Sequence, residues 1–316
     1  MLDKRASYTS ADSLPLKLLM LEDPGRLRPV HVQWMPTNRC NLSCKFCSCS
    51  ERDKSLEMPI DPAISVIRKF SEMGCEAVTI TGGGEPLCHP HLPEMVDEFC
   101  RHGVKVGLVT NGLLLPRVPV ETLRKLTWCR ISHGDDRRFT LQYRESLRTV
   151  VGSASSVDWA FSYVIGGQPD YASIREIVEF ANEHGFTHVR LVGDLMHPED
   201  APFDRVRQSI QGVDRIVIYQ PRKEFTRGKD CLIGYVKPLV SPDFWMYMCC
   251  GVQYALEPMS KDLPDELCMG SALDLESVYR DVSPRRVWCS RCYYQQYNDL
   301  LKVLSSPTSV AHREFV

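Results

Sequence analysis

Three cysteines in one loop are the residues of this chain most able to do chemistry. Cys40, Cys44 and Cys47 follow the apolar, strand-like run 30–35 and lie within eight residues, in the spacing CxxxCxxC. Three thiolates placed so closely can bind three irons of a [4Fe–4S] cube and leave the fourth iron without a protein ligand. An open iron can bind a second molecule, so the spacing indicates chemistry rather than a structural clip. A structural zinc site is the alternative.

Two glycine turns follow the cysteine loop, each at the end of a strand-like run. The β-branched run 77–81 leads into Gly82-Gly83-Gly84-Glu85, and the run 104–109 leads into Thr110-Asn111-Gly112. Because glycine has no Cβ, such a turn lets the backbone approach a ligand closely and present free N–H and C=O groups to it. Parallel sheets bind their ligands at the carboxyl ends of the strands, where both turns lie.

The cysteine spacing, the aromatic Phe46 before its last cysteine and the glycine turn one strand–helix unit later resemble the radical S-adenosylmethionine (SAM) enzymes. The resemblance implies that the open iron binds the amino and carboxylate groups of SAM. It also implies that an electron from the cluster cleaves SAM into methionine and a 5′-deoxyadenosyl radical, which abstracts a hydrogen atom from the substrate.

Further SAM-binding residues come from the same resemblance. Polar groups after Cys129 match those that contact the ribose, although the family more often has an aspartate where this chain has Gly134. The segment that ends at Asp194 matches the adenine-contacting segment. The SAM-binding residues implied in this way are Gly82, Gly83, Gly84, Glu85, Asn111, Ser132, Asp135 and Val192.

Strand-like and helix-like runs alternate from about residue 30 to residue 220. Apolar residues at helical spacing mark the runs 61–73, 92–102, 120–126 and 171–184, and strand-like runs include 159–165, 188–192 and 215–219. Repeated strand–helix units predict a parallel sheet with helices outside. Gly74, Gly103 and Gly185 stand where helix C-caps are expected. We therefore expect an α/β fold, and the resemblance implies a partial (β/α)6 TIM-type barrel.

The alternation stops near residue 221, where a cysteine-rich segment begins. Cys231 begins the run 231–240, which is predicted to be the first strand of a hairpin with a turn at 241–244 and a second strand at 245–248. Cys249 follows this hairpin, and Cys289 and Cys292 form a CxxC pair. Because a hairpin returns the chain, Cys249 could meet Cys231, and the four thiolates could close a second metal site. The expected domains are an N-terminal extension 1–29, a barrel 30–220 and a small C-terminal domain 221–316.

This cysteine order resembles the twitch extension of radical SAM enzymes, a shortened SPASM domain, and most of all that of the radical SAM dehydrogenase acting on an aminocyclitol. The resemblance implies a second, auxiliary [4Fe–4S] cluster held by Cys231, Cys249, Cys289 and Cys292. This chain has Phe244 where the usual turn has glycine, and Cys250 and Cys268 compete with Cys249 as ligands. Structural zinc is the alternative for this site too.

The composition is that of a soluble enzyme. At 316 residues and 43% hydrophobic, the chain can bury a large core. Its net charge of −2, with no long basic run, gives no electrostatic footprint for nucleic acid. No run reaches the roughly 18 apolar residues of a membrane span, and the first residues lack a signal-peptide core. Fourteen cysteines in a chain of this length fit metal ligation in a reducing cytoplasm.

Three reactions remain open after hydrogen abstraction. The auxiliary cluster could accept an electron while an alcohol is oxidised to a ketone, or bind the substrate during a rearrangement, or the enzyme could epimerise its substrate. The run 47–54 resembles phage-associated radical SAM proteins, some of which rearrange modified pyrimidine nucleotides, so an isomerase or mutase is the alternative. A non-enzymatic zinc-binding module is the opposing class.

The predicted partners are a small substrate (sugar-like, amino-acid-like or nucleotide) and a flavodoxin- or ferredoxin-type electron donor. Ser162, Tyr163, Arg190 and Asp194 could line the substrate cavity. The catalytic acid, base or hydrogen donor is not assigned by the sequence.

Overall fold

The computed structural model describes residues 17–19, 26–195, 197, 201–220, 226–228, 230–253, 263–287 and 289–305. Most of the expected N-terminal extension and parts of the expected C-terminal domain lie outside these residues. No helix within the described ranges is long and apolar enough to cross a membrane.

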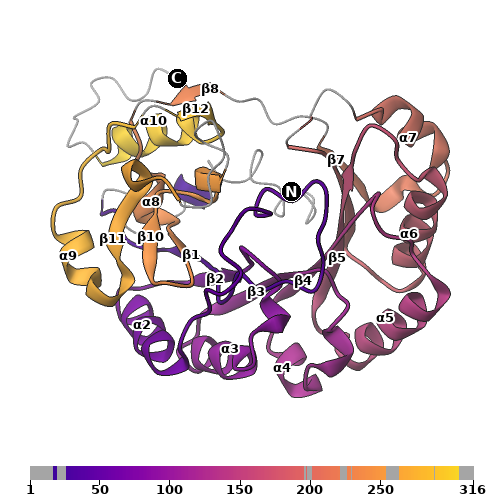
Figure 1. The fold of residues 1–316 in the computed structure, drawn as a ribbon, viewed down its shortest axis with the longest axis horizontal. Helices are drawn as coiled ribbons and strands as arrows, with labels where there is room; N and C mark the ends of the chain where they lie inside the picture. Colours follow the sequence, from indigo (N-terminus) through magenta and orange to yellow (C-terminus); the bar gives the residue numbers. More distant parts are fainter. Residues whose placement is uncertain are drawn as a thin grey trace, which may run out of the picture.

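A curved sheet of 10 strands forms the centre of the protein, in the order β11-β10-β9-β1-β2-β3-β4-β5-β6-β7 (Figure 1). Its first seven strands in sequence are β1 (His31–Trp34), β2 (Ala77–Ile80), β3 (Lys105–Thr110), β4 (Trp128–Gly134), β5 (Asp158–Ile165), β6 (His188–Gly193) and β7 (Val217–Gln220). Each of these strands pairs in parallel with the next. The last predicted strand, 215–219, starts later than expected, because a 3₁₀ turn occupies Asp214–Ile216.

Helices connect the parallel strands on the outer side of the sheet (Figure 1). They are α2 (Ile60–Glu72), α3 (Leu92–Arg101), α4 (Val120–Arg124), α5 (Leu141–Ser153), α6 (Tyr171–Glu183) and α7 (Phe203–Ser209). Further 3₁₀ turns lie at Pro86–Cys88, Leu115–Arg117, Cys250–Gln253, Asp265–Leu267 and Ala272–Asp274. The predicted α/β partial barrel is confirmed, although α5 and α7 have no counterpart in the prediction.

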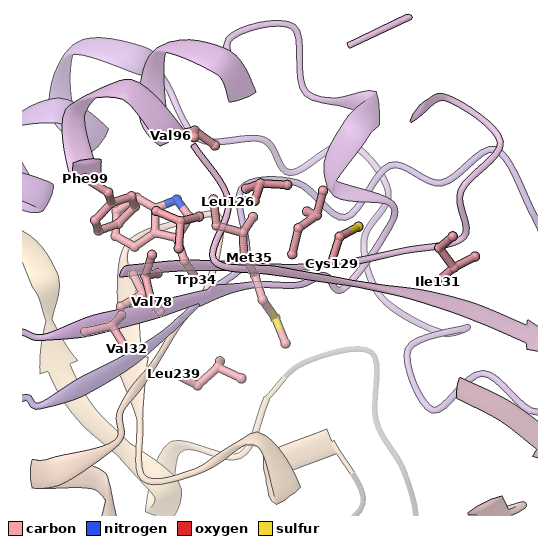
Figure 2. Packing of buried hydrophobic residues seen from close by; sticks show 14 of the residues in the cluster. Val32, Trp34, Met35, Val78, Val96, Phe99, Leu126, Cys129, Ile131 and Leu239 are labelled. Carbon is pink, nitrogen blue, oxygen red and sulfur yellow. The ribbon is translucent and has the colours of Figure 1, made fainter. Parts of the chain in front are cut away.

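The hydrophobic core lies between the sheet and these outer helices. Trp34 of β1 packs edge-on against Phe99 of α3, with the ring centroids 5.6 Å apart, and Figure 2 shows Val96 of the same helix nearby. The three glycines expected at helix ends, at 74, 103 and 185, all have positive φ angles of 85°, 76° and 71°. This backbone conformation is accessible to glycine without strain, so the predicted C-caps are confirmed.

Strand residues alternate between this core and the opposite, inner side of the sheet. On β4, Cys129 and Ile131 are fully buried in the core (Figure 2), whereas Arg130 and Ser132, which alternate with them, are more accessible. Successive side chains of a strand point to opposite faces. Arg130 and Ser132 therefore face the interior of the barrel.

The C-terminal segment extends the same sheet beyond β1. Strand β9 (Leu239–Val240) is parallel to β1, and β10 (Trp245–Tyr247) pairs antiparallel with β9 and with β11 (Cys268–Ser271). The remaining elements are β8 (Thr226–Gly228) and β12 (Cys289–Cys292), which form a second sheet of two strands, and the helices α8 (Ile233–Val236), α9 (Leu275–Arg280) and α10 (Gln295–Leu304). Figure 1 shows β10 and β11 on the side of β1 opposite to β2, with α9 beyond β11.

The predicted hairpin is present in β9 and β10, but the expectation of one strand over 231–240 is wrong, because α8 interrupts it. The Asn298 side chain of α10 accepts hydrogen bonds from the N–H groups of Leu232 and Ile233, both at 2.8 Å. These N–H groups lie at the start of α8, where a helix leaves donors unsatisfied. A distant side chain thus caps α8, which local sequence could not reveal.

Phe244, which stands where the related turn has glycine, adopts the glycine-like conformation with a φ of 66°. Its N–H donates to the carbonyl oxygen of Ser241 at 2.9 Å, and only 5% of the residue is exposed. Burial of a large aromatic side chain offsets the backbone strain. The turn therefore keeps its shape without glycine.

Candidate cofactor-binding site

The cysteine loop and both glycine turns line one pocket at the carboxyl edge of the sheet. The pocket has a volume of about 170 Å³. Its walls include Cys40, Cys44, Phe46, Cys47, Gly82, Gly84, Glu85, Asn111, Ser132, Asp136 and Arg137. The structure thus brings together most of the residues that the sequence proposes for a cluster and SAM.

Glu85 is fixed within this site rather than free to move. One carboxylate oxygen accepts hydrogen bonds from the Thr110 hydroxyl at 2.6 Å and the Leu87 N–H at 3.1 Å, and the other accepts from the Asn111 N–H at 2.7 Å. The residue is 3% exposed, and its burial raises the pKa of the carboxyl group. Glu85 therefore ties the first glycine turn to the second.

The first glycine turn presses directly against the chain that leads into the cysteine loop. A Cβ on Gly83 would lie 1.9 Å from the side-chain oxygen of Asn38, and a Cβ on Gly84 would lie 2.0 Å from the carbonyl oxygen of Arg39. The Gly84 N–H also donates to the Thr37 carbonyl at 3.1 Å. Only glycine fits this approach, which fixes the turn relative to the thiols.

Phe46 of the cysteine loop packs on the end of β4. A Cβ on Gly134 would meet the Phe46 ring at 2.2 Å. The aspartate that is more usual at position 134 would therefore collide with this ring. The packing of Phe46 on β4 thus explains why this chain has glycine at position 134.

The acidic residues after β4 do not have the arrangement that we expected. Asp135 accepts hydrogen bonds from the Tyr163 hydroxyl at 2.8 Å and the Gly166 N–H at 2.7 Å, so it joins the ends of β4 and β5 and is not part of the pocket wall. Asp136 lines the pocket instead. Val192, on the inner side of β6, also lies outside the pocket wall.

Arg137 is a pocket residue that the sequence reasoning missed. Its guanidinium donates to the carbonyl oxygens of Asn111 at 2.8 Å and Ser132 at 2.9 Å, and it stacks on the Tyr143 ring, 5.0 Å from the centroid. Backbone carbonyl groups thus hold the positive charge of Arg137 at the pocket wall. No carboxylate within the described residues forms an ion pair with this guanidinium. In the sequence, only its position directly after the polar end of a predicted strand could have indicated that Arg137 lines the pocket.

The loop thiols differ in their acidity. A hydrogen bond from the Cys49 thiol lowers the pKa of Cys47 to about 6, whereas burial raises the pKa of Cys44 to about 12. Cys49 also contacts the Gly82 carbonyl oxygen and the Gln253 side chain. Metal ligands must be deprotonated, so a cluster bound here displaces the proton of Cys44.

The three thiols in the wall of this pocket fit an iron–sulfur cluster, in which each thiolate binds a different iron. Among the described residues, no group of three or more His, Cys, Asp or Glu side chains could hold one metal ion. A zinc ion needs all its ligands about 2.3 Å or less from one point, whereas the thiolates of a [4Fe–4S] cube bind different irons. The glycine turns leave room for a ligand beside the thiols.

Comparison with known proteins agrees with this geometry. Residues 34–137 match the model of the radical SAM superfamily. These residues therefore form a radical SAM domain. The members that it resembles are enzymes, so the prediction of a radical SAM enzyme is confirmed.

Two curated relatives differ in how much of the chain they match. This radical SAM protein is 28% identical to a probable GTP 3′,8-cyclase of Archaeoglobus fulgidus over 255 residues, 72% of this chain and 83% of that protein. It is 36% identical to an S-adenosylmethionine-dependent nucleotide dehydratase of Lacinutrix mariniflava over 85 residues, but these cover only 25% of this chain and 17% of the dehydratase.

A solved structure supports the fold over most of the chain. SuiB of Streptococcus suis, bound to its precursor peptide SuiA, matches 89% of this radical SAM protein and 71% of its own chain, with a TM-score of 0.59 and 15% identity. The similarity covers more than residues 34–137.

The structure also gathers the C-terminal cysteines of this radical SAM protein. Burial and the neighbouring thiols of Cys289 and Cys292 raise the pKa of Cys231 to about 12. Burial, then the thiols of Cys250, Cys231 and Cys289, raise the pKa of Cys249. A Cβ on Gly228 of β8 would lie 2.9 Å from the Cys292 sulfur, so glycine allows the two strands to meet at the thiols. Cys231 therefore lies within electrostatic range of the other three proposed ligands.

The two competing cysteines have different surroundings. The Cys250 sulfur lies 3.4 Å from the Tyr294 hydroxyl, next to Cys249, and so stays close to the four thiols. Cys268 instead lines a separate pocket of about 490 Å³, and the charges that act on it belong to Arg285, Asp265 and Asp243. The surroundings favour Cys249 or Cys250 over Cys268.

Acid should destabilise this radical SAM protein through His133 at the pocket wall. Its ring stacks on Tyr163 with the centroids 5.5 Å apart, is 2% exposed, and has no hydrogen-bond partner for either nitrogen within the described part of the chain. Burial, then the charge of Arg137, lowers the pKa of His133 from 6.5 to about 3. Because the unfolded chain binds this proton more readily, stability present above pH 6.5 is lost as the pH falls toward 3.

Between pH 7 and pH 5 the wild type should lose about 2 kcal/mol more of its unfolding free energy than a His133→Phe variant, which has no titratable ring. Urea unfolding of both proteins at several pH values measures this difference. If the unfolding free energies of the two proteins change in parallel with pH, His133 does not cause the loss of stability in acid.

Proposed function

We propose that Cys40, Cys44 and Cys47 hold a [4Fe–4S] cluster and that the rest of the pocket holds SAM. The observation that carries the proposal is the single pocket shared by these thiols, both glycine turns and Ser132. When bound, the cluster and SAM supply a 5′-deoxyadenosyl radical, which abstracts a hydrogen atom from a small polar substrate.

In this proposal the protein's own groups position SAM. The carbonyl oxygens of the glycine turn accept from its amino group, and the Glu85 carboxylate holds the turn in place through three hydrogen bonds. Arg137, whose charge no carboxylate within the described residues neutralises by an ion pair, suits the SAM carboxylate. Ser132 suits the ribose, and Val192 on the inner side of β6 suits the adenine.

We further propose that Cys231, Cys249, Cys289 and Cys292 hold an auxiliary [4Fe–4S] cluster. Their mutual effects on pKa support this set, and Cys268 is not among the thiols that act on Cys231 or Cys249. Such a cluster binds the substrate or takes an electron from it, and the latter corresponds to a dehydrogenase. The reducing partner is a flavodoxin- or ferredoxin-type protein in the cytoplasm.

An isomerase or mutase that rearranges a modified pyrimidine nucleotide is the second candidate. Two relatives, the GTP 3′,8-cyclase and the nucleotide dehydratase, are named for nucleotide substrates. Their names support a nucleotide substrate for this chain without choosing between oxidation and rearrangement.

SAM cleavage tests the proposed function. Anaerobically reconstituted protein with dithionite should convert SAM into 5′-deoxyadenosine and methionine, and a Cys44→Ala variant should lose at least about 100-fold of this rate, because one iron loses its ligand. Cys100→Ser is the matched control, because the Cys100 thiol of α3 donates to the Lys125 carbonyl oxygen and is not part of the pocket wall. Equal cleavage by the Cys44 variant and the control would refute the proposal.

A further inference from the structure

The inner face of the barrel carries basic side chains below the SAM pocket. Arg130 of β4 lies two residues before Ser132 on the same face, and Arg190 of β6 shares a row with Ser132 through Ser162 of β5. Two residues along a strand span about 7 Å. Arg190 is therefore level with Ser132, and Arg130 is one step deeper in the barrel.

Lys237, which follows α8, adds a third positive charge close to Arg130. Burial lowers the pKa of Arg130 to about 10. Burial and the charge of Arg130 lower the pKa of Arg190, and burial lowers the pKa of Lys237, on which Arg130 also acts. The charges of Arg190 and Lys237 are thus close enough to Arg130 to be repelled by it. We call Arg130, Arg190 and Lys237 the cationic inner patch.

The described residues provide no carboxylate in an ion pair with any member of this patch. Arg190 donates to the neutral Ser162 hydroxyl at 3.0 Å, and Arg130 lies 5.4 Å from the centroid of the Trp128 ring. The buried Arg130 Nε finds no hydrogen-bond partner within the described ranges. Buried charges are normally paired, because desolvation without a partner is costly.

The thiolates of the second cysteine site could neutralise only part of the positive charge of the cationic inner patch. Cys250 and Cys249 act on Lys237, so a cluster there would neutralise this lysine in part. Neither cysteine is among the charges that act on Arg130 or Arg190. The groups that raise the pKa are the Cys129 thiol for Arg130 and the Tyr293 hydroxyl for Arg190, and neither is a carboxylate. An anionic ligand would therefore pair with both arginines.

We propose that the cationic inner patch anchors a phosphate group of the substrate, with Arg130 and Arg190 as its main ligands. The planar guanidinium fork matches phosphate oxygens, and a phosphate dianion neutralises more of a threefold positive site than one carboxylate does. The anchor would hold the rest of the substrate between the SAM pocket above and the second cysteine site beside Lys237. The inference rests on the proposed function for its substrate and narrows that substrate to a phosphorylated one.

Calorimetric titration of cluster-loaded protein with inorganic phosphate tests the patch. Wild type should bind phosphate at least about tenfold more tightly than Arg190→Gln or Arg130→Gln variants, because each loses a charge-assisted hydrogen bond. Arg148→Gln makes the same change of charge on the exposed surface of α5, where Arg148 pairs with Glu145, and should bind like wild type. No phosphate binding, equal binding of acetate, or an equal loss in the Arg148 variant would overturn the proposal.

Two further measurements separate this role from others. In phosphate-free buffer the Arg130→Gln variant should melt at the wild-type temperature or above it, because a repelling buried charge is gone; a lower melting temperature would assign Arg130 a structural role instead. Saturating SAM should leave the phosphate affinity unchanged. Loss of phosphate binding in the presence of SAM would mean that the patch serves the SAM carboxylate, which contradicts the proposal.

The same samples distinguish a failure of this inference from a failure of the proposed function. If SAM is cleaved but phosphate does not bind, only the phosphate anchor is refuted. If phosphate binds through both arginines but SAM is not cleaved, the anion site stands and the radical SAM function fails for this chain.

Discussion

Replacing Cys40, Cys44 and Cys47 together by alanine should halve the iron content of anaerobically purified protein, from about eight to about four irons per chain. The expected loss is one whole cluster, because a [4Fe–4S] cube that loses all its thiolates has no other anchor in this pocket. The remaining irons stay with the C-terminal cysteines, which have their own surroundings of β8, α8 and β12. Iron and sulfide assays on wild type and on the triple variant measure the loss of one cluster and the retention of the other.

The complementary variant, with Cys231, Cys249, Cys289 and Cys292 replaced, should lose the other four irons and keep the cluster of the loop. Cys268→Ala is the matched control and should lose none, since the charges around Cys268 are those of Arg285, Asp265 and Asp243. About four irons in wild type and none in the loop variant, with zinc retained in both, would contradict the auxiliary cluster and assign the C-terminal cysteines to a structural zinc.

The parts of the fold that could be predicted are those that depend on a few neighbouring residues in the sequence. The helix ends at Gly74, Gly103 and Gly185 depend on a backbone angle that glycine adopts most readily, so local sequence was sufficient. Helix α8 could not be predicted, because its first N–H groups are capped by Asn298, more than 60 residues later. Its residues are apolar throughout, and a short buried run has no periodicity that separates helix from strand.

The candidate site shows the same division. The spacing of the three loop cysteines and the two glycine turns predicted which segments would meet, and these segments share one pocket. Asp135, the proposed SAM-binding residue, lies outside the pocket wall that Asp136 lines, because its carboxylate accepts hydrogen bonds from Tyr163 and Gly166 at the end of β5. The absence of an aspartate at Gly134 became intelligible only through its contact with Phe46, which lies far away in the sequence.

Gly84→Ala should lower kcat/KM for SAM cleavage by about 100-fold, the scale expected when reacting groups are misplaced by about 1 Å. The added methyl group would meet backbone atoms, 2.0 Å from the Arg39 carbonyl oxygen and 2.4 Å from the Asn38 carbonyl carbon. Backbone cannot rotate away as a side chain can, so the turn must shift. The same N–H network that ties Glu85 to Asn111 would carry this shift across the SAM pocket.

Gly152→Ala is the matched control, because the same methyl group on α5 would have nothing within 4 Å. Inside a helix, alanine in place of glycine should stabilise the protein by about 0.5–1 kcal/mol and leave SAM cleavage unchanged. The iron content of both variants should match wild type, since neither change removes a thiol. If Gly84→Ala cleaves SAM as fast as Gly152→Ala, the close approach of the glycine turn to residues 37–39 does not position SAM, and that part of the proposed site fails. If it loses iron as well, the turn supports the cysteine loop itself, and its effect on SAM is indirect.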